Sequence, residues 1–114
     1  MKIRDIVTIL EGTVINGSEK LGHDVEFGFA SDLMSDVLTL QTENLVLITG
    51  LVNIQTIRTA EMADISCIVF VRKKKASPEI VDLAKENSMV IIECPYSMFK
   101  TCGLLFNSGL NPVY

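Results

Sequence analysis

Three short apolar segments, evenly spaced in the second half of the sequence, constrain the fold of this chain most strongly. They start at residues 45, 67 and 89, which are 22 residues apart, and comprise Leu45–Thr49, Cys67–Val71 and Met89–Glu93. Each is rich in Val or Ile. Continuous apolar runs of this length are typical of strands that are buried on both faces, as in a parallel sheet.

Each apolar segment is followed by residues that favour the start of a helix. Asn53, Ser77 and Ser97 are good N-cap residues, and Pro78 suits the first helical position. Apolar residues then recur at helical spacing after each cap. Because helices that join parallel strands form right-handed crossovers, the sequence predicts an α/β fold with a mainly parallel sheet and helices on its faces.

The first half of the sequence is less regular. Residues 1–10 have the spacing of an amphipathic helix, and residues 12–16 are typical of a short strand that ends at an Asn-Gly turn. Residues 25–29 alternate as an exposed or edge strand does, and residues 31–38 favour a short helix. No linker divides the sequence, so we expect a single domain over residues 1–114.

Composition excludes several functional classes. The net charge is −4, so we expect no binding to nucleic acid, which favours basic domains. The amino-terminal residues are charged and lack a long apolar stretch, so we expect neither a signal peptide nor a membrane association. The three cysteines, Cys67, Cys94 and Cys102, form no CxxC pair, which favours a reduced, cytoplasmic protein without a metal site.

Polar residues follow each of the three predicted parallel strands. The carboxyl ends of parallel strands share one edge, where ligands of α/β proteins bind. Backbone N–H groups at helix starts attract anions, and the basic run Arg72–Lys75 adds positive charge. A phosphate site is one interpretation, and capped helices with solvated loops are the other. The candidate ligand-binding residues are Thr49, Gly50, Asn53, Lys73, Ser77 and Ser97.

Catalytic patterns are missing from the sequence. His23 is the only histidine, and it has no companion at metal-ligand spacing. Asp32 and Asp36 are four residues apart, so we expect them on one face of the helix at 31–38, as a cap and a solvated carboxylate. No GxGxxG or GxxxxGK[ST] loop is present. We therefore expect no enzyme activity and no cofactor.

The last predicted helix is apolar around most of its surface. Gly103 allows another backbone to approach it closely, and a partner subunit is one way to bury such a helix. The alternative is that residues 107–114 fold back over it. We predict a homodimer whose interface comprises Met98, Phe99, Cys102, Leu105 and Phe106.

Several segments together resemble the DRTGG domain family over nearly the whole chain. The resemblance is carried by residues 32–38, by Thr49-Gly50 after a buried strand and by residues 102–110. Through this family, the chain resembles the amino-terminal domain of HPr kinase/phosphorylase and modules of phosphotransacetylases and of pyrophosphatases that contain CBS domains. The resemblance implies a three-layer α/β/α sandwich, often dimeric, and it gives the domain no reaction of its own. Kinase chemistry in the HPr enzyme lies in a different domain that has a phosphate-binding loop.

The chain departs from the namesake motif at two loops. Gly50 is followed by Leu51 and Val52 where the family has Asp and Arg, and the family's paired glycines would fall near Arg72-Lys73, where no glycine is present. Two functions follow from these observations. The first is a regulatory or ligand-sensing homodimer that binds an adenine nucleotide or another phosphorylated small molecule. The second is a protein-interaction subunit of a redox complex of hydrogenase type, or of a metabolic complex, without a small ligand.

Overall fold

The computed structural model describes residues 1–114. The chain contains five α-helices, one 3-10 turn at Ser18–Lys20, and six strands in one sheet. The helices are α1 (Ile3–Leu10), α2 (Met34–Val37), α3 (Ile54–Met62), α4 (Pro78–Glu86) and α5 (Met98–Asn107). The strands are β1 (Thr13–Asn16), β2 (Phe27–Ala30), β3 (Leu45–Thr49), β4 (Cys67–Phe70), β5 (Val90–Glu93) and β6 (Asn111–Pro112).

The sheet is mainly parallel, as predicted. Its order is β1-β5-β4-β3-β2-β6, and only β1 runs antiparallel to its neighbour. The three apolar segments form β3, β4 and β5, which lie side by side in chain order. Every residue of these three strands is buried, so the continuous apolar runs do mark strands that are covered on both faces.

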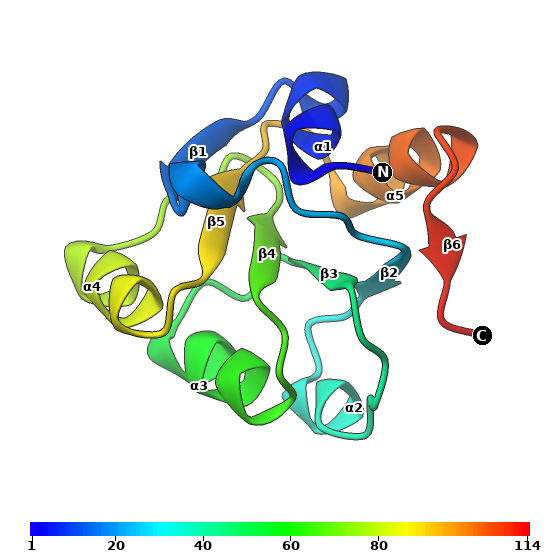
Figure 1. Ribbon diagram of the computed structural model, residues 1–114. Coiled ribbons are helices and arrows are strands. Elements are labelled where there is room, and N and C mark those ends of the chain that lie inside the picture. Colours follow the sequence, from blue (N-terminus) through cyan, green and yellow to red (C-terminus); the bar gives the residue numbers. More distant parts are fainter.

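Helices cover both faces of the sheet and give a three-layer α/β/α sandwich (Figure 1). Side chains of one strand alternate between the two layers, so that Val46 and Ile48 join α1 and α5 on one face. Leu45 and Leu47 join α2, α3 and α4 on the other face. Each face holds a cluster of 14 buried apolar residues.

The direction of the chain explains which helix covers which face. Strands β2, β3, β4 and β5 are laid down in one direction across the sheet without a reversal. Because right-handed crossovers that advance in one direction place their helices on one face, α2, α3 and α4 all lie together. The opposite face is covered only by α1 and α5, which come from the two ends of the chain (Figure 1).

Two elements of the first half differ from the prediction. The strand expected at 25–29 begins at Phe27, and it is flanked on its outer side by the two-residue strand β6. The helix expected at 31–38 covers only Met34–Val37. Both differences come from tertiary contacts, because the chain end pairs with β2 and the side chain of Asp32 bonds to the end of β3.

The residues of the central strand make a direct test of the fold. Ile68 of β4 has no solvent exposure and packs against the α3 and α4 layer. Ile68→Ala is expected to lower the free energy of unfolding by about 2–5 kcal/mol, because it leaves a cavity in a layer that cannot collapse. Urea denaturation measures the change. Gln55→Ala on the exposed side of α3 is the control, expected within about 0.5 kcal/mol of wild type, and equal losses for both variants would contradict the assignment.

Candidate functional site

The carboxyl ends of the parallel strands bring four loops to one edge of the sheet. Direct contacts join neighbouring loops, since the backbone N–H of Arg72 donates to Tyr96 O at 2.7 Å and that of Lys73 donates to Cys94 O at 3.0 Å. The loops begin after β2, β3, β4 and β5 and comprise residues 31–33, 50–53, 71–77 and 94–97. The six predicted ligand-binding residues therefore belong to one edge.

Three of these six residues are used as helix caps. Asn53, Ser77 and Ser97 each accept a hydrogen bond from the backbone N–H three residues later, at 2.9, 3.3 and 3.1 Å. The predicted helix starts are thus correct. In these bonds the side-chain oxygens are acceptors, so the O–H groups of Ser77 and Ser97 and the amide N–H groups of Asn53 are not used as donors in them.

Thr49 and Gly50 are committed to Asp32. The buried Thr49 hydroxyl donates to Asp32 Oδ1 at 2.9 Å and accepts from the Leu51 N–H at 3.1 Å. The Gly50 N–H donates to the same carboxylate oxygen at 2.7 Å. The end of β3 is therefore fixed by the loop that follows β2.

Asp32 itself corrects a sequence prediction. We expected Asp32 and Asp36 on one helix face, but α2 begins only at Met34 and the Asp32 carboxylate turns towards the sheet. The prediction was wrong because local spacing carries no information about the neighbouring strand. Its position directly after β2 is the signal that would have placed it, once β2 is known to run parallel to β3.

The electrostatics of this edge centre on the same carboxylate. The Gly50 N–H is the main cause that holds the pKa of Asp32 below its usual value, and burial acts in the opposite sense. The Thr49 hydroxyl, Arg72 and Lys74 also lower it. Arg72 Nη2 lies 3.6 Å from Asp32 Oδ2, and both side chains are about half exposed.

Lys73 is the one predicted ligand residue whose side chain is exposed and not used as a cap. It lines a cavity of about 300 Å³ together with Glu11, Lys75 and Glu93. Glu93 is buried and accepts from the Ala76 N–H at 2.8 Å and from Lys75 Nζ at 3.3 Å. The positive charge of Lys75 is thus compensated, whereas Lys73 and Lys74 form no ion pair.

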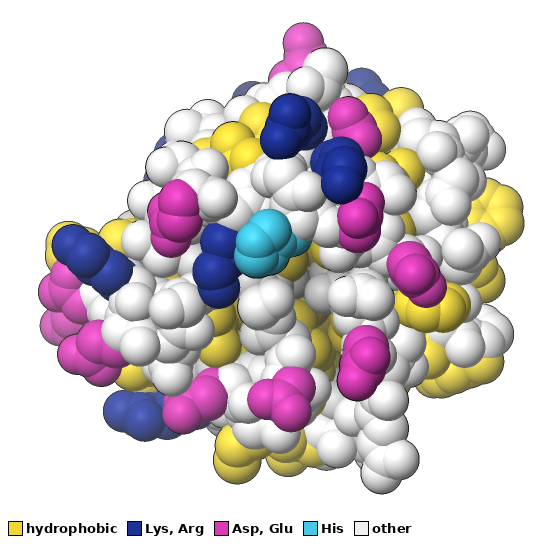
Figure 2. Space-filling view, in the orientation of Figure 1, with side chains coloured by type: hydrophobic (Ala, Val, Ile, Leu, Met, Phe, Trp, Pro, Cys, Tyr) yellow, Lys and Arg dark blue, Asp and Glu magenta, His cyan; other side chains and the backbone are white.

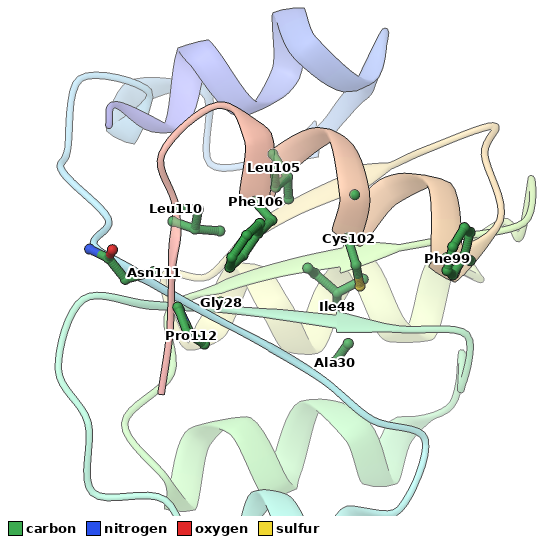
Figure 3. A pocket seen from close by; sticks show the side chains of 11 residues that line it. Gly28, Ala30, Ile48, Phe99, Cys102, Leu105, Phe106, Leu110, Asn111 and Pro112 are labelled. Carbon is green, nitrogen blue, oxygen red and sulfur yellow. The ribbon is translucent and has the colours of Figure 1, made fainter. Parts of the chain in front are cut away.

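A second feature is an apolar cavity of about 350 Å³ on the α5 side of the sheet (Figure 3). Its walls come from β2, β3, α5 and the chain end, and Figure 3 shows Cys102 and Phe106 pointing from α5 towards the sheet. The lining residues are Gly28, Ala30, Ile48, Phe99, Cys102, Gly103, Leu105, Phe106, Leu110, Asn111 and Pro112. The sequence did not indicate this cavity, because it needs the chain end beside β2.

The predicted dimer residues divide into exposed and buried groups. Phe99 is 91% exposed and Phe106 is 64% exposed, whereas Leu105 is only 1% exposed and packs in the chain's own core. Met98 and Cys102 are half-buried beside the same core. The tail does not fold back over α5, which was the alternative: it pairs with β2 as β6, places Leu110 against Gly28 and leaves both phenylalanines uncovered.

Nucleophiles and metal ligands are poorly placed. Burial raises the pKa of the Cys67 thiol to about 12 and also raises that of Cys102, so neither is an activated thiolate. His23 is exposed, on a surface face with scattered acidic and basic side chains (Figure 2). No group of three His, Cys, Asp or Glu residues is placed to hold a metal ion. None of the helices is long and apolar enough to span a bilayer.

Comparison with known proteins identifies the family. The sequence matches the DRTGG domain over residues 5–108. This chain belongs to the DRTGG domain family. A search of curated proteins found no match.

The DRTGG fold is also seen in a solved structure from Clostridium perfringens. That structure holds the CBS and DRTGG domains of the regulatory region of a pyrophosphatase, complexed with the activator diadenosine tetraphosphate. The TM-score is 0.75 at 18% sequence identity, over 96% of this chain and 47% of that chain. The present chain therefore spans about half of the length of that regulatory region.

The loop after β4 contains two consecutive residues in the left-handed region. Arg72 and Lys73, the second and third residues after β4, have φ angles of 62° and 60°. This left-handed region is unstrained for glycine and strained for residues with a Cβ. Two hydrogen bonds to the loop after β5 hold the strained conformation in place.

Lys73→Gly tests this backbone strain. It is expected to raise the free energy of unfolding by about 0.5–1 kcal/mol. The reason is that the strain relieved in the folded state outweighs the conformational entropy that glycine adds to the unfolded chain. Lys74→Gly is the matched control, since Lys74 has no positive φ, and it is expected to be destabilising or neutral. Urea denaturation measures the free energy of unfolding of both variants. A lower value for Lys73→Gly than for wild type would contradict the assigned backbone strain.

Proposed function

We propose that this DRTGG domain is a non-catalytic regulatory module that works as a homodimer and senses a phosphorylated small molecule, such as an adenine nucleotide, at the carboxyl edge of its sheet. The observation that carries the ligand half is the exposed basic loop, in which Lys73 and Lys74 have no carboxylate partner. Helices α3, α4 and α5 begin at the same edge, and helix starts favour anions.

The solved DRTGG relative supports this direction, because its regulatory region was crystallised with a nucleotide activator. The oxygens of Asn53, Ser77, Ser97 and Thr49 serve the chain's own backbone or Asp32. A phosphate needs hydrogen-bond donors, and the hydroxyls of Ser77 and Ser97 act only as acceptors in their caps. Lys73, Ser77 and Ser97 therefore stay candidates for the anion, whereas the Thr49 hydroxyl already donates to Asp32.

The homodimer half rests on the α5 face. Phe99, Cys102, Gly103 and Phe106 recur at helical spacing, and a Cβ on Gly103 would meet no atom within 4 Å. Two α5 helices can therefore approach closely, and each phenylalanine can cover the apolar cavity of the partner. Exposed aromatic side chains beside an apolar hollow are typical of interface centres.

A denaturation assay tests the ligand half. ATP at about 100 times its Kd is expected to add about 2.7 kcal/mol to the free energy of unfolding, since it binds only the folded state. The double variant Lys73→Gln/Lys74→Gln is expected to lose most of this gain. Lys85→Gln, which removes an exposed charge at the end of α4, is the control and keeps it. No stabilisation of wild type by ATP, ADP, AMP or diadenosine tetraphosphate would contradict the ligand half.

Sedimentation equilibrium tests the dimer half. The wild-type chain is expected to sediment as a dimer, and the double variant Phe99→Ser/Phe106→Ser as a monomer of unchanged stability, because both rings are largely exposed in the chain. Met62→Ser is the matched control, since Met62 is 68% exposed on α3, on the opposite face of the sheet. A monomeric wild type at millimolar concentration would contradict the homodimer.

The second candidate function is a protein-interaction subunit of a redox or metabolic complex without a small ligand. The apolar α5 face favours it equally, because another protein can bury the same phenylalanines. Leu51 and Val52 add little, since they pack partly on the chain's own core. Co-purification from a native lysate tests this function, and recovery of the chain only with copies of itself would count against it.

The three free cysteines fit a reducing compartment, and we propose the cytoplasm as the location of this domain.

A further inference from the structure

The side chain of Arg72 lies across the end of β3. Its guanidinium group covers Gly50 so closely that a Cβ at that position would sit 2.0 Å from Nη2 and 2.8 Å from Cζ. No other atoms lie as close to that point. The place next to Thr49-Gly50 is thus filled by an arginine from the loop after β4.

The guanidinium of Arg72 has hydrogen-bond donors without a partner in the chain. Its one charged partner is Asp32, at 3.6 Å, and its N–H groups make no hydrogen bond within the chain. An Arg guanidinium has five donors in a planar fork that matches a phosphate group. The side chain is also half exposed, so several donors remain accessible to a ligand.

The backbone beneath Arg72 is fixed while its side chain is not. Hydrogen bonds from the Arg72 and Lys73 N–H groups to the loop after β5 hold the left-handed turn. Only the weak ion pair to Asp32 restrains the guanidinium. Asp32 keeps its own position through Thr49 and Gly50, so the ion pair can break without loss of the loop structure.

We propose that Arg72 is the residue that receives the phosphate group of the ligand, and that Asp32 competes with the ligand for it. This inference rests on the proposed ligand-sensing function and assigns it two residues. The Asp32 carboxylate acts as an internal stand-in for the anion, and the ligand replaces it at the guanidinium. Lys73 and Lys74 flank the same turn and add attraction for a polyphosphate chain.

Isothermal titration calorimetry with ATP, tripolyphosphate and adenosine tests the inference at fixed ionic strength. Asp32→Asn keeps an acceptor oxygen for Thr49 and Gly50 but removes the competing charge. We expect this variant to bind ATP and tripolyphosphate with about threefold to fivefold higher affinity, which corresponds to the free energy of an exposed ion pair. Arg72→Gln is expected to lower the affinity for both ligands by about tenfold or more. Lys85→Gln is the control for lost charge, with unchanged affinity, and adenosine should not distinguish the variants.

The pattern of results separates the two proposals. ATP binding that is equal in wild type, Asp32→Asn and Arg72→Gln would overturn the role of Arg72 and leave the ligand-sensing function standing. Binding by Asp32→Asn but not by wild type would support the competition. Absence of binding in every protein would overturn both.

A second variant guards against misfolding of Asp32→Asn. Gly50→Ala introduces a Cβ that displaces only the flexible end of Arg72, and Gly50 has no positive φ that would strain alanine. It frees the guanidinium from Asp32 without a change in charge. We expect tighter tripolyphosphate binding, and unchanged or weaker binding by a folded Gly50→Ala would count against the competition.

Discussion

Burial of β3, β4 and β5 on both faces is the constraint on which the rest of this structure depends. Parallel strands without exposed residues need helices above and below, and the helices that join them cover only one of the two layers because the strands advance in one direction. The other layer is left to α1 and α5. The position of the last helix, and the incomplete cover that it gives to β2, follow from this arrangement.

The same topology shapes both candidate surfaces. Ligand crevices in open α/β sheets form where the strand order reverses, and β2 to β5 contain no reversal. Contacts within the chain use many of the polar groups at the carboxyl edge, namely the caps at three helix starts and the bonds from Thr49 and Gly50 to Asp32. The groups at this edge that stay accessible to a ligand include the positively charged side chains of Arg72 and Lys73. The opposite feature, an apolar hollow, lies under α5.

Most of the second half of the fold could be predicted from the sequence. Continuous apolar runs, three N-caps and equal spacing are local signals, and each corresponds to a strand or a helix start in the structure. The first half was harder because its short elements depend on distant partners. Strand β2 is completed by the chain end, and Asp32 leaves the predicted helix for a contact with the next strand. The left-handed turn at Arg72 could not be predicted, because no glycine occupies it.

By itself, the sequence determined the α/β class, the parallel strands, the helix caps, the family resemblance and the edge at which polar loops gather. These depend on periodicity and on residue types over a few positions, which local physical chemistry governs. Only the tertiary structure decided which polar groups are free. Hydrogen bonding between loops far apart in the chain occupies Thr49 and Gly50, core packing buries Leu105, and the folded tail leaves Phe99 and Phe106 exposed. Accessibility is a property of neighbours in space, so no local pattern can contain it.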